Sequence, residues 1–169
     1  MLLTKYDKEF KRLLKYLYIP DDFRFDCKKC GDCCRHEPGF VWIFDKDISR
    51  IASYLEMSED DFLSKHCINK GGIFSIKEKS NYDCLFWDKD VMGGGCSIYE
   101  ARPAQCRNFP YWVSLFLSEN NIKKESERCP GLYSGDTIIP KKEIIKRLKI
   151  DFIDRYDFYI KVFNDLIAD

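Results

Sequence analysis

Apolar residues recur at helical spacing near both ends of the chain. An amphipathic helix is predicted over residues 4–19, ended by Pro20, and a longer one over residues 140–167, where Pro140 suits the first helical position. The first apolar stripe comprises Phe10, Leu13, Leu14, Leu17 and Tyr18. The second comprises Ile145, Leu148, Phe152, Tyr156, Ile160, Phe163 and Ile167.

Shorter apolar runs between these helices indicate strands. Residues 40–44 are typical of a buried strand, and residues 73–77 and 82–87 of the two strands of a hairpin. Segments 96–110 and 118–135 are rich in turn-forming residues. We expect both segments to be irregular and held by bound ligands, with a helical turn or two in the first.

Two further helices are predicted from capping residues. Asp45 or Asp47 can cap a helix that ends near Leu55. Ser58 can cap a shorter helix that carries Cys67 on its apolar face.

Together these elements predict a small α+β fold that is predominantly helical. We expect a single domain over residues 1–169, because no internal repeat, low-complexity segment or linker divides the chain. Its core would be a cysteine-rich segment at residues 25–132, flanked by the helices at residues 4–19 and 140–167.

The composition is that of a globular protein with balanced charge. Of 169 residues, 45% are hydrophobic and 15% are aromatic, and 28 basic side chains balance 28 acidic ones. This balance provides no basic footprint for nucleic acid and no polybasic patch for a membrane. The N-terminus lacks the apolar segment of a signal peptide, and no apolar run approaches the roughly 20 residues that span a bilayer. We therefore expect a cytoplasmic protein with reduced thiols, and a protein partner of unknown identity stays open.

Nine cysteines provide the strongest chemical signal, because clustered thiols in a reducing compartment are typical of metal ligands. Four of them lie between Cys27 and Cys34, where Gly31 allows a sharp turn of the backbone. The Cys-x-x-Cys spacing suits a zinc knuckle, and the whole run equally suits an iron–sulfur cluster. The predicted ligands are Cys27, Cys30, Cys33, Cys34, Cys84, Cys96, Cys106 and Cys129.

The adjacent pair Cys33 and Cys34 bears on the number of metal centres. Consecutive side chains in extended backbone point to opposite sides, so one tetrahedral ion rarely takes both. Eight thiols would then divide into two sets of four, with the adjacent pair between them. One centre with spare thiols, or two ions that share bridging thiolates, are the alternatives.

Basic side chains near the thiols can neutralise an anionic centre. Four thiolates around a divalent ion carry a net charge of about −2. Arg35, Arg102 and Arg107 are therefore expected to balance this charge or to donate hydrogen bonds to sulfur. Lys28 and Lys29 are expected to be solvated.

The other candidate side chains are expected to be structural or exposed. Cys67 is predicted to be a buried thiol outside the ligand set, and His66 a surface residue. His36, two residues beyond Cys34, is a less favoured alternative ligand. The chain has no glycine-rich phosphate loop and no motif of serine hydrolases or zinc proteases, so enzymatic activity stays open and would depend on the metal or a thiol.

Two longer motifs resemble a known family. The first is Cys27-x-x-Cys30-x-x-Cys33-Cys34, and the second runs Gly95-Cys96-Ser97-Ile98-Tyr99-Glu100-x-Arg102-Pro103-x-x-Cys106-Arg107-x-Phe109-Pro110. With Cys129-Pro130-Gly131 they resemble the CxxCxxCC family of domains named for zinc or iron chelation, the YkgJ family. The resemblance covers residues 25–132 and implies a metal-binding domain of prokaryotic cytoplasmic proteins that uses the eight cysteines named above. Such domains are often labelled iron–sulfur oxidoreductases, and flagellin lysine methylases have a similar cysteine pattern.

Three functions are consistent with these features. The first is a metal-binding module with one or two centres, filled by zinc or by an iron–sulfur cluster such as [4Fe–4S], in a structural or accessory role. The second is an iron–sulfur redox protein or oxidoreductase. The third is an enzyme related to the protein-lysine methylases, although the chain has no recognisable separate site for a methyl donor.

Overall fold

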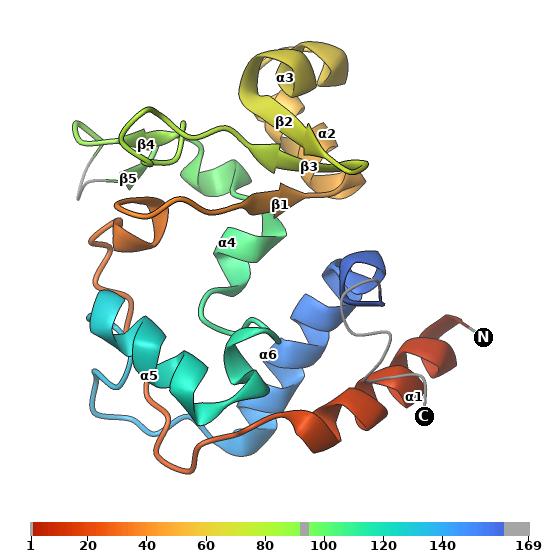
Figure 1. Ribbon diagram of the computed structural model, residues 1–169, viewed down its shortest axis with the longest axis vertical. Helices are drawn as coiled ribbons and strands as arrows, with labels where there is room; N and C mark the ends of the chain where they lie inside the picture. Colours follow the sequence, from red (N-terminus) through yellow and green to blue (C-terminus); the bar gives the residue numbers. More distant parts are fainter. Residues whose placement is uncertain (1, 92–94, 161–169) are drawn as a thin grey trace. The chain divides into compact units, whose positions relative to one another are not determined.

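The chain forms two compact units in the computed structural model, which describes residues 2–91 and 95–160 (Figure 1). Unit 1 comprises Met1–Asp26 and Asn108–Asp169, and unit 2 comprises Cys27–Arg107. Helices predominate and the strands are few and short, so the fold is α+β. That the chain forms a single domain over residues 1–169 stays a prediction.

Unit 2 contains a three-stranded antiparallel sheet. Its strands are β1 (Val41–Ile43), β2 (Cys67–Lys70) and β3 (Ile73–Ile76), in the order β1-β3-β2. The predicted strand at residues 40–44 is confirmed by β1. In the centre of the sheet, Ile76 lies opposite Val41 on one side and opposite Cys67 on the other.

Of the predicted pairing of residues 73–77 with residues 82–87, the structure has only a backbone hydrogen bond from the Leu85 N–H to the Lys77 carbonyl at 3.0 Å. Strand β3 instead forms a hairpin with β2, through Gly71 and Gly72 at φ angles of 63° and 88°. Positive φ at both turn residues matches the right-handed twist of the flanking strands, which explains the two glycines. Residues 67–70 show no clear alternation of apolar and polar side chains, so their sequence does not reveal the strand.

A second, two-stranded sheet follows in unit 2. It pairs β4 (Trp87–Asp88) with β5 (Gly95–Cys96), and Trp87 lies directly opposite Cys96. Of the predicted strand at residues 82–87, only Trp87 lies in a strand, and Cys84 makes an isolated bridge with Glu78.

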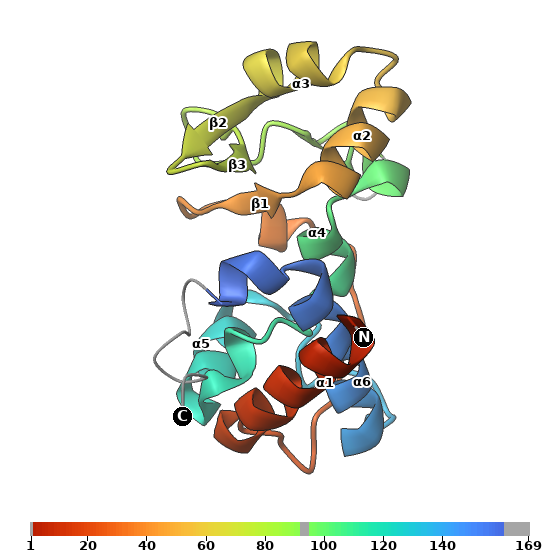
Figure 2. The same cartoon turned by 90° about the vertical axis from the view of Figure 1, so that its right-hand side faces the viewer.

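Two helices pack on one side of the three-stranded sheet (Figure 2). They are α2 (Asp45–Tyr54) and α3 (Glu59–His66), both near their predicted positions. Ser58 caps α3 as predicted, accepting a hydrogen bond from the Asp61 backbone N–H. The predicted caps of α2 are wrong, because the N-cap residue is Phe44 and no side chain caps that helix. The buried core of unit 2 consists of Ile43, Ile48, Ile51, Ala52, Phe62, Cys67, Ile76, Phe86, Ile98 and Ala101.

Short helical turns occupy much of the rest of unit 2. They are η2 (Asp32–Cys34), η3 (Tyr99–Ala101) and the five-residue helix α4 (Ala104–Asn108), whose last residue belongs to unit 1. The expectation of a helical turn or two within residues 96–110 is confirmed by η3 and α4.

Unit 1 is helical. Its elements are α1 (Leu2–Leu13), η1 (Leu14–Tyr16), η4 (Leu115–Leu117), α5 (Glu119–Arg128) and α6 (Lys141–Asp154). The irregular segment predicted at residues 118–135 is wrong in its first half, because α5 fills it and Ser118 caps that helix through the Asn121 backbone N–H. The predicted N-terminal helix is confirmed through residue 16 only.

The C-terminal helix is shorter than predicted. After α6 ends, Arg155 interrupts the helix, and helical backbone resumes at residues 156–160. The remainder of the predicted helix, with Phe163 and Ile167, lies outside the described residues.

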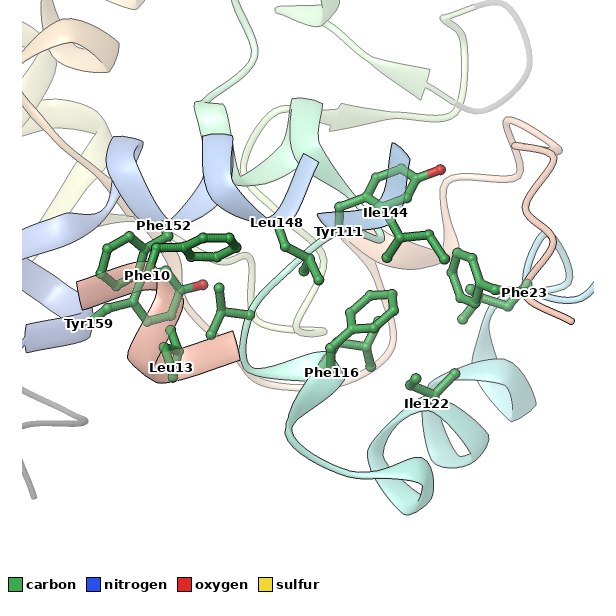
Figure 3. Packing of buried hydrophobic residues seen from close by; sticks show 13 residues of the cluster. Phe10, Leu13, Phe23, Tyr111, Phe116, Ile122, Ile144, Leu148, Phe152 and Tyr159 are labelled. Atoms are coloured by element: carbon green, nitrogen blue, oxygen red, sulfur yellow. The ribbon is translucent and has the colours of Figure 1, made fainter. Parts of the chain in front are cut away.

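The core of unit 1 joins the terminal helices to the segment around η4 (Figure 3). Phe10 of α1 packs against Phe152 of α6, with ring centroids 5.5 Å apart. Phe23 packs against Phe116 and Tyr111, with centroid distances of 5.3 and 6.1 Å. The predicted apolar faces of both terminal helices therefore supply much of this core.

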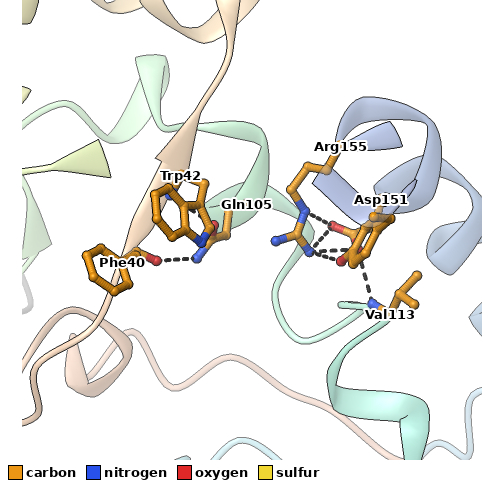
Figure 4. Close-up of polar contacts among 7 residues, drawn as sticks. Phe40, Trp42, Gln105, Val113, Asp151 and Arg155 are labelled. Atoms are coloured by element: carbon orange, nitrogen blue, oxygen red, sulfur yellow. Dashed lines mark hydrogen bonds and ion pairs between the residues drawn. The ribbon is translucent and has the colours of Figure 1, made fainter. Parts of the chain in front are cut away.

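A buried charge network lies beside this core (Figure 4). Asp151 is 0% exposed and accepts hydrogen bonds from Arg155, Tyr159 and the backbone N–H of Val113. The Arg155 guanidinium, which is 4% exposed, contacts both carboxylate oxygens at 2.6–2.7 Å. The pair connects the last turn of α6 to the residue that follows the helix.

The Cys129-Pro130-Gly131 turn packs tightly against the backbone of Asp26, and all four residues belong to unit 1. The Asp26 backbone N–H donates to the Gly131 carbonyl at 3.0 Å. A Cβ atom on Gly131 would lie 2.7 Å from the Asp26 carbonyl oxygen, so only glycine fits here. Within the described residues no helix is long and apolar enough to cross a membrane.

Candidate metal centre

The adjacent pair Cys33 and Cys34 lies in the 3₁₀ turn η2 at the start of unit 2. Gly31 begins the turn in the left-handed region, at φ 75°, which confirms the predicted role of this glycine. The Cys34 backbone N–H donates to the Gly31 carbonyl at 2.9 Å. The two sulfur atoms are 3.8 Å apart. The premise of extended backbone at this pair is therefore wrong, and with it the argument that the two side chains must point to opposite sides.

A backbone hydrogen bond connects this turn to Cys84. The Cys84 N–H donates to the Cys34 carbonyl at 2.7 Å. The next residue, Arg35, reinforces the connection, since its Nε lies 3.6 Å from the Asp83 carboxylate and its guanidinium carbon 4.0 Å from the centroid of the Trp87 ring. These contacts hold the turn with Cys33 and Cys34 against the segment with Cys84, which is far away in the sequence.

Cys96 reaches the same region through β5, where it pairs with Trp87. The Ser97 backbone N–H donates to the Phe86 carbonyl at 2.8 Å and extends this contact. The residues that position Cys96 therefore lie beside those that hold Arg35.

Cys106 is presented by the short helix α4. Asp47 of α2 accepts a hydrogen bond from the Ala104 backbone N–H at 2.9 Å, and Gln105 bonds to the backbone of β1. Sequence reasoning gave neither side chain this role, because an Asp and a Gln at these positions carry no local signal of a distant partner.

The thiols of unit 2 interact with one another electrostatically. A hydrogen bond with Cys33 and burial raise the pKa of Cys34, and charge on Cys33, Cys106 and Cys84 raises it further. Burial raises the pKa of Cys84 to about 11, with Cys96 acting in the same direction. Burial also raises the pKa of Cys96, and it raises that of Cys106 well above its ordinary value, with other thiols of the group contributing. These five residues are called the thiol group below.

Mutual repulsion within the thiol group has a direct chemical consequence. Each thiolate that forms makes the next one harder to form, because burial and like charge both disfavour the ionised state. A cation bound among the sulfur atoms would remove this repulsion, and its binding would release protons. The group is therefore a set of soft donors that suits zinc or iron.

Arg102 lies beside these thiols. Its charge lowers the pKa of Cys96 and of Cys106, against the effect of burial. Its guanidinium carbon is 3.6 Å from the centroid of the Tyr99 ring, and its Nε is buried without a hydrogen-bond partner among the described residues. This orphaned donor fits a metal-bound sulfur, as expected for an anionic thiolate centre.

The other two arginines expected at the centre contact other groups. Arg35 lies against Asp83 and Trp87, and its Nε, like that of Arg102, is buried without a hydrogen-bond partner among the described residues. Arg107 donates through Nη1 to the Arg102 carbonyl at 2.6 Å, and its side chain is exposed. Their roles toward a metal stay predictions.

The remaining predicted ligands are Cys27, Cys30 and Cys129. Cys27 and Cys30 have exposed side chains at the start of unit 2. Cys129 belongs to unit 1, where it follows α5 and packs partly against the core. In the part of the chain that the structure describes, no three His, Cys, Asp or Glu side chains are arranged to hold an ion, so the eight-cysteine ligand set and its division between centres stay predictions.

Cys67 and the two histidines make other contacts. Cys67 is 6% exposed in the core of unit 2, as predicted for a buried structural thiol. His66 is half-buried rather than on the surface, with its ring 5.8 Å from that of Phe62 and 5.4 Å from that of Phe86. His36 is exposed and lies 3.4 Å from the Asp32 carboxylate.

Comparison with known proteins shows the family of this chain. A family model described as "CxxCxxCC: Putative zinc- or iron-chelating domain" matches residues 26–130, which is more than half of the chain. The chain belongs to this family. Unit 2 lies wholly within the matched range, as do the five members of the thiol group.

A protein similar to this chain has no described activity. An uncharacterized protein of Methanocaldococcus jannaschii is 30% identical over 126 residues, which make up 73% of this chain and 66% of the relative. The match thus spans just under two thirds of the relative's own length. No solved structure matches the chain.

Proposed function

We propose that this protein is a metal-binding module in which the thiol group of unit 2 holds a zinc ion with a structural role. Cys33 and Cys34 bind the same ion, and two of the other three thiols complete a four-thiolate site. The observation that carries the proposal is the distance of 3.8 Å between the sulfur atoms of Cys33 and Cys34. With zinc–sulfur bonds of about 2.3 Å, two sulfurs on one tetrahedral ion lie about 3.8 Å apart.

This distance favours a single ion over a [4Fe–4S] cluster. In such a cluster each cysteine binds a different iron, so its sulfurs stand further apart than two ligands of one ion. A [2Fe–2S] cluster places two cysteines on each iron and also accommodates the pair. Zinc and [2Fe–2S] differ in the sulfide that only the cluster contains.

The structural role follows from how the site is built. Its ligands come from η2, β5 and α4, each of five residues or fewer, and from the segment before β4, which is neither helix nor strand. Elements this short bury little apolar surface of their own, so a shared ion would contribute directly to their folding. When bound, zinc with four thiolates supplies cross-linking and no redox chemistry.

Metal analysis tests the proposal. Protein purified anaerobically from cells supplied with both metals should contain zinc, with neither iron nor acid-labile sulfide, in a stoichiometry of at least one ion per chain. Replacing Cys33 or Cys34 by serine should lower the affinity for zinc, as should two of the three single replacements at Cys84, Cys96 and Cys106, whereas Cys67→Ala should leave the metal content unchanged. Brown protein with iron and sulfide would instead establish an iron–sulfur cluster and favour the redox alternative.

A further inference from the structure

A buried carboxylate outside the cysteine motifs organises the segment that carries Cys106. Asp47, in the first turn of α2, is 3% exposed. Its Oδ1 accepts a hydrogen bond from the Ala104 backbone N–H at 2.9 Å. Ala104 is the first residue of α4, so Asp47 caps this helix from a distant position in the sequence, in the manner of an N-cap side chain.

Arg50, one turn further along α2, extends the contact. Its Nη2 donates to the Asp47 carboxylate at 2.6 Å and to the Arg102 carbonyl at 2.7 Å. Its Nε donates to the Ala101 carbonyl at 3.3 Å. Asp47 and Arg50 together therefore satisfy three backbone groups on the segment that leads into α4.

Gln105 fixes the same helix through hydrogen bonds to Phe40 and Trp42 (Figure 4). Its side-chain oxygen accepts from the Trp42 N–H at 3.1 Å, and its side-chain nitrogen donates to the Phe40 carbonyl at 2.9 Å. Strand β1 is at the edge of its sheet, so Gln105 takes the place of a neighbouring strand there. The two residues before Cys106 are therefore both held by hydrogen bonds, Gln105 to β1 and Ala104 to Asp47 of α2.

We propose that Asp47, supported by Arg50, is a positioning residue of the metal centre that orients Cys106 for the ion. The inference rests on the proposed function, in which Cys106 belongs to the ligand group. Helix α4 has five residues, too few to be stable alone, so contacts from outside decide its position. A shift of the helix would displace the Cys106 sulfur from the other thiols.

Zinc affinity of three variants tests this role. Asp47→Ala removes the cap and the partner of Arg50, and it should weaken zinc binding by about tenfold or more, the effect typical of groups that orient a ligand. Asp47→Asn keeps an oxygen for the Ala104 N–H but loses the charge, so a smaller loss of about threefold is expected. Asp45→Ala, at an exposed position of the same helix turn, should bind zinc like the wild type.

Three measurements separate positioning from general stability. Affinity is measured by competition with a chromophoric chelator, the melting temperature is taken with and without zinc, and the visible spectrum of the cobalt-substituted protein reports the ligand geometry. We expect the zinc-dependent rise in melting temperature to shrink in Asp47→Ala and the cobalt spectrum to change. Should this variant fail to fold, the affinity of Asp47→Asn decides.

Several results would overturn the inference. Wild-type zinc affinity in Asp47→Ala, or in Asp47→Asn where the first variant does not fold, would show that Asp47 does not position a ligand. An equal drop in melting temperature with and without zinc, at unchanged affinity, would reduce its role to stability alone. A wild-type protein that binds no metal would overturn the proposed function and this inference with it, whereas a Cys106→Ser variant of unchanged affinity would overturn this inference alone.

Discussion

Replacement of Asp151 is a sharp test of the energetics of unit 1. In Asp151→Ala, the carboxylate that accepts from Arg155, Tyr159 and the Val113 N–H is lost. The Arg155 guanidinium is 4% exposed and would be left buried without its counter-charge. The Val113 N–H would lose its acceptor as well.

The expected cost is large compared with the stability of a small domain. Breaking a buried ion pair by removal of one partner costs about 3–5 kcal/mol. A buried donor left unsatisfied costs about 1–3 kcal/mol more, although such terms overlap. We expect the free energy of unfolding to fall by about 4 kcal/mol, a large share of the roughly 5–15 kcal/mol typical of native proteins.

Urea unfolding followed by circular dichroism measures this change, with a double variant as the decisive comparison. Asp151→Ala combined with Arg155→Met should be more stable than Asp151→Ala alone, because the uncompensated charge is gone. Asp157→Ala, at an exposed position nearby, is the control. The reasoning would be refuted if Asp151→Ala lost less than about 1 kcal/mol of unfolding free energy. It would also be refuted if the loss in the double variant equalled the sum of the losses in Asp151→Ala and Arg155→Met.

Three further outcomes follow from the structure. Gly131→Ala should cost about 1–3 kcal/mol of unfolding free energy, because its Cβ would lie 2.7 Å from the Asp26 carbonyl oxygen. Gly39→Ala is the control and should be nearly neutral, since nothing lies within 4 Å of the added carbon. Equal effects of the two variants in thermal unfolding would contradict this expectation. Burial, with Lys77 and Lys65 nearby, lowers the pKa of His66 in the folded protein, so the unfolded chain takes up the proton first and stability falls as the pH drops below about 6.5. His66→Phe should reduce this loss in melting scans from pH 7.5 to 5 with a chelator present, and an unchanged pH dependence would count against it. Removal of zinc by a chelator should lower the melting temperature of the wild type and leave the helices of unit 1 largely intact by circular dichroism, while no effect of the chelator would argue against a structural ion.

Local signals predicted the elements whose interactions are local. Ser58 caps α3 because its side chain bonds to a backbone group three residues away, and this pattern is visible in the sequence. Gly31 takes a positive φ at the turn before Cys33 for the same kind of reason. The apolar stripes of α1 and α6 predicted two helices and many of the side chains in the core of unit 1.

Elements that depend on distant partners were not predictable. Strand β3 pairs with β1 and β2 instead of with residues 82–87, because the register is decided by which strands bury a common face. Helix α5 has few apolar residues, so the polar segment around it resembled a loop, and its buried Ile122 packs on a core assembled from distant residues. The effect of Asp47 on α4 is likewise invisible in the sequence.

For the metal centre, the sequence alone determined the chemistry and the tertiary structure decided the grouping. Cysteine spacing indicated soft thiolate ligands, because donor type is a property of the residues themselves. Only the fold brings Cys84, Cys96 and Cys106 into electrostatic reach of the adjacent pair, since loops of many residues separate them. Backbone conformation at Cys33 and Cys34 then decides whether one ion can take both, and the 3₁₀ turn places their sulfurs 3.8 Å apart where extended backbone would separate them.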